Sequence, residues 1–207
     1  MAIKAVIFDI GGVILDADLE RYASLASTRF GCSEDDLRTV VRANLAPLEK
    51  GQIDSQAFWA AVGEGLARVG KGKPTNPALL KGLWRNVLKD TMKTNPQMVN
   101  LCGDLHRRGL IVAALSNTIV EHAEYLLSAG IYRPFNPCIL SCAVGMHKPD
   151  KAIYQLTAQQ VGKPTKECLF IDDSKANVEG GRSAGMAVHH FTGLPPLLQE
   201  LRRHKLL

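Results

Sequence analysis

Near the start of the chain lies the segment Lys4-Ala5-Val6-Ile7-Phe8-Asp9-Ile10-Gly11-Gly12-Val13, in which a short apolar run ends in a carboxylate and two glycines. A continuous apolar run such as residues 5–8 is typical of a strand that is buried on both faces of a sheet. The two glycines let the backbone turn tightly and bring its N–H groups close to a ligand. The pattern therefore predicts that Asp9 stands at the mouth of a sheet, although an isolated Asp in such a position more often caps the next element.

Further apolar runs end in polar side chains in the same way. Residues 110–115 lead into Ser116-Asn117, and residues 168–171 lead into Asp172-Asp173. Two more strands are predicted at residues 137–141 and 186–190, with helical segments between all of these runs. This alternation indicates a parallel α/β sheet, in which ligands bind at the carboxyl ends of the strands. We therefore expect Asp9, Ser116 and the acidic pair to converge.

The segment between about residues 16 and 90 has a different character, because helical periodicity replaces the strand pattern. Ser33 resembles the start of a capping box, and Asp54 can cap a second helix. The chain thus divides into a core of residues 1–15 and 91–207 and a helical cap of residues 16–90.

Other helix boundaries follow from caps and glycines. Asn76-Pro77 predicts the start of a further helix in the cap. Thr118 and Glu121 form a second candidate capping box, for a helix on which Leu126 and Leu127 are expected to face inward.

Composition limits the class of protein. At 207 residues the chain is long enough for one domain with a modest insertion. Its 46% hydrophobic and 22% charged residues are ordinary for a soluble enzyme, and no apolar run approaches the roughly 20 residues of a membrane helix. Met1 leads almost directly into the first strand, which leaves no room for a secretion signal, so a cytoplasmic location is expected.

The cysteines and the net charge carry little specific information. The five cysteines include no Cys-x-x-Cys pair, so we expect neither a zinc cluster nor a disulfide framework. The net charge of +5 is dispersed, and no aromatic-rich basic stripe supports nucleic-acid binding. A general preference for anionic small substrates explains this charge as well.

The motifs taken together resemble the haloacid dehalogenase (HAD) superfamily of phosphohydrolases. The closest similarity is to the branch that contains the phosphatase-like half of soluble epoxide hydrolases and small bacterial sugar-phosphate phosphatases, and it covers nearly the whole chain. The resemblance implies a Rossmann-like core with a cap inserted after the first strand. It also implies that Asp9 attacks phosphorus to form an aspartyl-phosphate and that Lys148 binds phosphate and restrains the nucleophile.

The same resemblance assigns further residues to the phosphate, namely Ile10, Gly11, Ser116 and Asn117. Two of these have a structural alternative, because Ser116 and Asn117 are also common helix N-caps. Lys148 has one too, as a solvated loop lysine, and His147 is interpreted as a loop or substrate-edge residue rather than a metal ligand.

Adjacent carboxylates at Asp172-Asp173 would repel each other unless they share a cation. Hard oxygen ligands beside a phosphate imply Mg²⁺. By resemblance, Asp173 coordinates the ion directly with Asp172 in support, and Asp9 and the backbone carbonyl of Gly11 complete the protein ligands. Asn177 can face the same site from the next helix.

The chain departs from the family at Gly11. Most family phosphatases carry a second Asp there as general acid and base, a function worth about 10²- to 10⁴-fold in rate. Asp16 and Asp18 are candidate substitutes, with polar residues of the cap junction as the alternative interpretation.

The sequence therefore predicts a Mg²⁺-dependent phosphomonoesterase that acts on a small phosphorylated metabolite, with a sugar phosphate as the expected substrate. Two alternatives stay open. One is a 2-haloacid dehalogenase, which uses an aspartate nucleophile without a metal, and the other is a catalytically weak, phosphate-binding regulatory domain.

Overall fold

A five-stranded parallel sheet forms the centre of the protein, whose computed structural model describes residues 2–17, 19–70 and 92–207. The strand order is β5-β4-β1-β6-β7, and every neighbouring pair is parallel. The strands are β1 (Ala5–Phe8), β4 (Ile111–Ser116), β5 (Cys138–Leu140), β6 (Cys168–Asp172) and β7 (Ala187–His190). This architecture confirms the α/β, Rossmann-like core.

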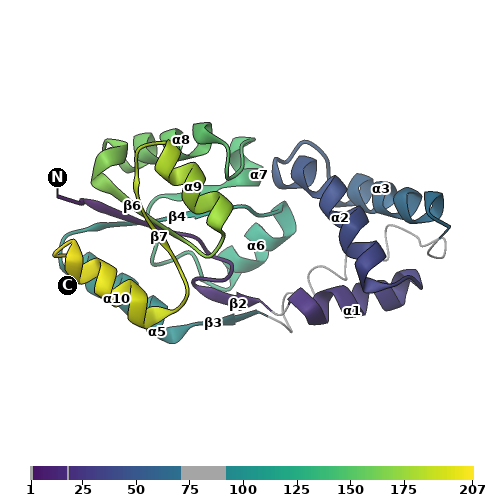
Figure 1. The fold of residues 1–207 in the computed structure, drawn as a ribbon, viewed down its shortest axis with the longest axis horizontal. Coiled ribbons are helices and arrows are strands. Elements are labelled where there is room, and N and C mark those ends of the chain that lie inside the picture. Colours follow the sequence, from purple (N-terminus) through teal and green to yellow (C-terminus); the bar gives the residue numbers. More distant parts are fainter. Residues whose placement is uncertain (1, 18, 71–91) are drawn as a thin grey trace.

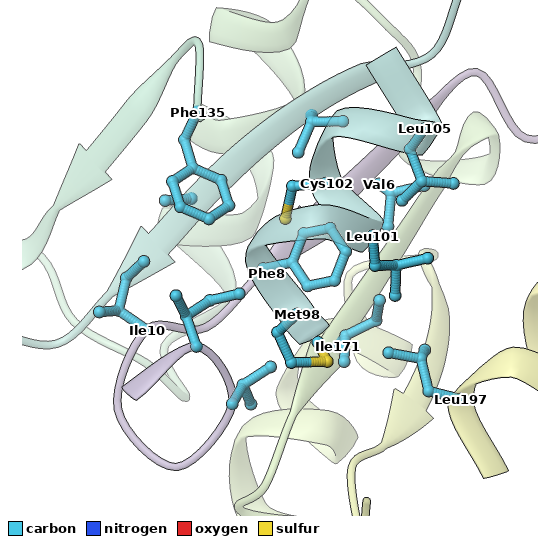
Figure 2. Close-up of a cluster of buried hydrophobic side chains, with 14 of the residues drawn as sticks. Val6, Phe8, Ile10, Met98, Leu101, Cys102, Leu105, Phe135, Ile171 and Leu197 are labelled. Carbon is cyan, nitrogen blue, oxygen red and sulfur yellow. The ribbon is translucent and has the colours of Figure 1, made fainter. Parts of the chain in front are cut away.

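Helices cover both faces of the sheet (Figure 1). Side chains of β1 alternate between the faces, as the period of two in a strand requires. Val6 and Phe8 pack against α5 (Pro96–Arg107) and α10 (Leu194–Arg203), in the cluster that Figure 2 shows. On the opposite face, Ala5 and Ile7 pack against α8 (Lys151–Val161). β1 is thus buried on both sides, and its carboxyl end is held rigidly at the middle of the sheet.

The remaining core elements are short or peripheral. They are α6 (Val120–Ser128), α7 (Ser141–Val144), the 3₁₀ turn η1 (Thr165–Glu167) and α9 (Lys175–Ser183). No helix in the described ranges is long and apolar enough to span a membrane.

Among the described residues, three helices project from the core as a helical insert, namely α1 (Leu19–Phe30), α2 (Glu34–Glu49) and α3 (Ser55–Arg68). The insert has its own apolar cluster, which includes Phe30, Phe58 and Trp59. Figure 1 shows it beyond the sheet, at the end opposite the two chain termini.

An antiparallel ribbon connects the insert to the core. It consists of β2 (Leu15–Ala17) and β3 (Met92–Thr94), with Leu15 opposite Thr94. The sequence pattern did not indicate this ribbon. The exact division at residues 16–90 stays a prediction, and the helix start expected at Asn76-Pro77 lies outside the described residues.

The sequence predicted the start of a helix correctly where the capping side chain binds a backbone N–H only three residues away. The hydroxyl of Ser33 accepts the N–H of Asp36 at 3.1 Å, and the carboxylate of Asp54 accepts the N–H of Ala57 at 2.8 Å. Both expected N-caps of the insert are therefore confirmed.

The expected cap at Thr118 is wrong. α6 starts after Ile119, which has no capping side-chain bond, while the N–H of Thr118 donates to Oγ of Ser141 at 2.9 Å. Leu126 is buried as expected, but Leu127 is 69% exposed. The strand expected at residues 137–141 is also shorter, because the backbone enters α7 at Ser141.

Candidate active site

The carboxyl ends of three central strands meet at one edge of the sheet. Phe8 at the end of β1 is opposite Ala114 of β4 and Ile171 of β6, so the three strands end at the same edge. Asp9 and Asp172 directly follow Phe8 and Ile171, Ser116 ends β4 two residues after Ala114, and all three are buried. The polar groups singled out in the sequence are thus brought together by sheet topology.

Lys148 lies between two of these carboxylates. Its Nζ is 2.8 Å from Oδ1 of Asp9 and donates to Oδ2 of Asp172 at 2.7 Å. The Lys148 side chain is 1% exposed, which excludes a solvated loop lysine. Burial alone lowers the pKa of Lys148, but Asp9 and Asp172 more than offset this, and the pKa lies above its usual value. The buried ammonium therefore stays charged.

The electrostatic environment of Asp9 is different. Burial raises the pKa of its carboxyl to about 6, and the negative charge of Asp172 acts in the same direction, while Lys148 opposes both. The N–H of Ile10 donates to Oδ1 at 2.7 Å, and Lys148 contacts the same oxygen. One carboxylate oxygen of Asp9 is thus held by two donors, which fixes the direction of the other.

The two carboxylates of the acidic pair have distinct surroundings. Asp172 is fully buried, and its Oδ1 accepts the N–H of Ser174 at 2.8 Å and Nδ2 of Asn177 at 3.0 Å. Asn177 therefore faces this site from α9. Asp173 is exposed, and it lies directly beside the backbone of Gly12.

A divalent cation fits these residues. Asp9, Asp172 and Asp173 can each direct one oxygen so that the three oxygens lie within 4.8 Å of one another. Carboxylate oxygens at this separation suit a hard cation such as Mg²⁺. The oxygens of Asp172 are already occupied by hydrogen bonds, whereas Asp173 is the carboxylate that offers oxygens toward solvent.

The side chain of Asn117, directly after β4, holds the loop that carries Lys148. Its Nδ2 donates to the carbonyl of Lys148 at 2.9 Å, and its Oδ1 accepts the N–H of Lys148 at 2.8 Å. Because α6 begins only at Val120, neither Ser116 nor Asn117 is its N-cap. The Asn117 side chain instead positions the backbone that carries the lysine.

Gly11, which stands where most family phosphatases carry the acid, has open space beside it. A Cβ atom added at Gly11 would meet nothing within 4 Å. Asp16 is exposed on β2, and Asp18 lies outside the described residues.

Sequence reasoning missed two neighbours of the site. Glu49, at the end of α2, is partly buried within the electrostatic reach of His147 and Lys148. His190, at the end of β7, has its Nε2 2.9 Å from the carbonyl of Asp173. Neither belongs to a local motif, and both reach the site only through the tertiary fold.

Comparison with known proteins finds relatives among phosphatases and haloacid dehalogenases. A phosphatase from Mycobacterium tuberculosis is 28% identical over 200 residues, which cover 91% of this chain and 87% of the relative. An (S)-2-haloacid dehalogenase from Pseudomonas is 31% identical over 83 residues, which cover 40% of this chain and 36% of that enzyme.

The fold also matches a solved structure. It superposes on a HAD family enzyme of Bacteroides thetaiotaomicron, in complex with magnesium and inorganic phosphate, with a TM-score of 0.72. The two chains are 23% identical, and the match covers 91% of this chain and 93% of the other. The family model of haloacid dehalogenase-like hydrolases matches residues 3–185. The chain therefore belongs to the haloacid dehalogenase-like hydrolases.

Proposed function

We propose that this hydrolase is a Mg²⁺-dependent phosphomonoesterase that acts on a small phosphorylated metabolite, such as a sugar phosphate, through an aspartyl-phosphate at Asp9. The observation that carries the proposal is the position of Asp9. It contacts the buried ammonium of Lys148, and it is one of three carboxylates whose oxygens lie close enough together to share one cation. A phosphate ester needs both, because its oxygens and the attacking carboxylate are all negative.

Each residue has a defined function in this proposal. Asp9 attacks phosphorus with one carboxylate oxygen, the ester P–O bond breaks, and water later hydrolyses the aspartyl-phosphate. Lys148 neutralises phosphate oxygens while Asp172 holds its ammonium in place. Ser116 and the backbone of Ile10 and Gly11 supply hydrogen bonds to the phosphate.

Asp9, Asp173 and the carbonyl of Gly11 would hold Mg²⁺, with Asp172 behind them. The ion would withdraw negative charge from the phosphoryl oxygens. The relatives support this assignment, since the first is described as a phosphatase and the Bacteroides enzyme binds magnesium and phosphate.

A dehalogenase is the second candidate, because haloacid dehalogenases are among the relatives. Such an enzyme has no need for a cation, whereas the carboxylate oxygens of Asp9, Asp172 and Asp173, which lie within 4.8 Å of one another, suit one.

The test is a panel of phosphate esters assayed with Mg²⁺ and with EDTA, alongside chloride release from 2-chloropropionate and chloroacetate. Phosphate release that depends on Mg²⁺ is the expected result. Chloride release without metal would replace the proposal with dehalogenation. Binding of phosphate with Mg²⁺ but no turnover would favour the regulatory domain.

A further inference from the structure

The helical insert reaches the candidate active site through the C-terminal end of α2. Lys50, which follows α2 directly, has its Nζ 3.4 Å from Oδ2 of Asp150, in the loop that carries Lys148. The backbone of Gly51 lies against the carbonyl of Cys142 in α7, so closely that a Cβ atom there would be 2.5 Å from that oxygen. Figure 1 shows this end of α2 beside α7.

Glu49 is the last residue of α2 and lies at this contact. Its side chain is partly buried, and the charges of His147 and Lys148 act to lower the pKa of its carboxyl. Lys148 in turn contacts Asp9 at 2.8 Å. Glu49 is thus an acidic residue of the insert whose charge interacts with the ammonium of the site.

A neighbouring polar atom is also unpaired. Nδ1 of His147 is buried and has no hydrogen-bond partner among the described residues, and its nearest acidic group, Asp150, is 3.8 Å away. A buried nitrogen without a partner is unfavourable unless a ligand contacts it. Nδ1 of His147, two residues after Gly145 and next to Lys148, is therefore available to a polar group of the substrate.

The core lacks an acid at the usual position. Gly11 stands there, and a side chain at that position would have open space. The leaving oxygen of a phosphate ester thus meets no carboxyl group from residue 11.

We propose that Glu49 is the general acid and base of the reaction, supplied by the insert instead of by residue 11. This inference rests on the proposed phosphatase function. In the first step the Glu49 proton moves to the ester oxygen while the P–O bond breaks and Asp9 bonds to phosphorus. In the second step the Glu49 carboxylate takes a proton from water, whose oxygen bonds to phosphorus while the bond to Asp9 breaks. Alcohol and phosphate leave, and both carboxyl groups are restored.

The environment of Glu49 suits this cycle. Burial raises the pKa of its carboxyl above the usual value, although the positive charges of His147 and Lys148 oppose the shift. A raised pKa favours the protonated form that the first step needs.

The test compares Glu49→Gln with native protein on phosphate esters that differ in leaving-group pKa. Without an acid, alkyl phosphates should lose about 10²- to 10⁴-fold in kcat/KM, whereas 4-nitrophenyl phosphate, which leaves unaided, should lose little. The plot of log(kcat/KM) against leaving-group pKa should therefore become steeper.

A second readout concerns the second step. Glu49→Gln should release one nitrophenolate per site from 4-nitrophenyl phosphate in a burst, followed by slow turnover, because no base activates water. The control is Glu64→Gln on α3, whose side chain is 70% exposed and pairs with Arg68 in the same helix. It should behave as native protein.

Gly11→Asp in the Glu49→Gln background should restore part of the lost rate on alkyl phosphates, because the new side chain has space. If Glu49→Gln fails to fold, Glu49→Asp, which keeps the carboxyl group, is compared with native protein on the same esters instead. An unchanged slope without a burst, or an equal rise in KM for every ester at constant kcat, would overturn the inference while leaving the phosphatase function intact. Absence of turnover in native protein on the whole panel would overturn both.

Discussion

The backbone of Gly12 lies so close to Asp173 that a Cβ atom at position 12 would be 2.2 Å from Oδ2 of that carboxylate. Gly12 also has a φ of +73°, a conformation that costs an L-residue roughly 1–2 kcal/mol. Gly12→Ala should therefore displace Asp173 and raise the Mg²⁺ concentration for half-maximal activity, by about 10- to 100-fold. A metal titration of activity measures this.

Gly109→Ala is the matched control for that variant, since Gly109 also has a positive φ, of +80°, and a Cβ atom there meets nothing within 4 Å. It should keep the native Mg²⁺ requirement. Equal metal dependence in the two variants would contradict direct coordination by Asp173.

Asp172 and Asp173 should respond differently to removal. Asp172→Ala leaves the buried Lys148 ammonium with one carboxylate partner in place of two, and breaking a buried pair typically costs about 3–5 kcal/mol. Asp173→Ala should weaken Mg²⁺ more while changing stability less, because Asp173 is exposed. Urea unfolding and metal titration of both variants test the difference, and the reverse order would overturn the assignment of the direct ligand.

Asp9→Asn should abolish turnover, because an amide cannot form the acyl-phosphate. The fold should persist, since Lys148 keeps its 2.7 Å hydrogen bond to Asp172. Activity and circular dichroism, measured together, check this. Inhibition by beryllofluoride, which mimics a phosphorylated aspartate, should disappear in the same variant, and native-like turnover would refute the mechanism.

Mg²⁺ binding should depend on pH through Asp9. Burial raises the pKa of this carboxyl to about 6 in the metal-free protein, so protons compete with the cation below that pH. Apparent Mg²⁺ affinity at pH 5 should be about tenfold weaker than at pH 7, because only roughly one carboxylate in ten is then ionised. Calorimetric titrations at the two pH values test this. The same affinity at both pH values would contradict a pKa of about 6 for Asp9.

Stability should fall in weak acid through His122 on α6. Burial lowers the pKa of this imidazole to about 4, whereas its usual value is 6.5, so the unfolded chain takes up the proton first. Stability is therefore lost as pH falls from 6.5 toward 4, by at most about 3 kcal/mol. Comparing urea unfolding of native protein and His122→Gln at pH 7 and pH 5 isolates this contribution. A constant difference between the two proteins would contradict it.

The core and the site could be predicted where neighbouring residues in sequence carry the signal. The strands that end at Phe8 and Ser116 are uninterrupted apolar runs, and an apolar run buried on two faces has few alternatives. Because parallel strands share one carboxyl edge, the meeting of Asp9 with Asp172 followed from the pattern.

Features that depend on contacts between distant segments could not be predicted. Thr118 is a residue type that often caps helices, yet its N–H donates to the hydroxyl of Ser141, 23 residues away. Glu49 reads as an ordinary helical glutamate, and only the docking of Lys50 and Gly51 on the core brings it near Lys148. No periodicity in the sequence encodes such a contact.

The ribbon of β2 and β3 has a consequence for engineering and for divergence. The chain leaves the core at Leu15 and returns at Thr94, directly opposite it. Another insert could therefore replace this one at these positions, provided that its two ends lie as close together as neighbouring strands. The strand order of the central sheet would not change. A different insert would keep Asp9, Lys148 and the acidic pair, but it would replace Glu49. Under the proposed role of Glu49, exchanging the insert would then change how the leaving oxygen is protonated, in a single genetic event.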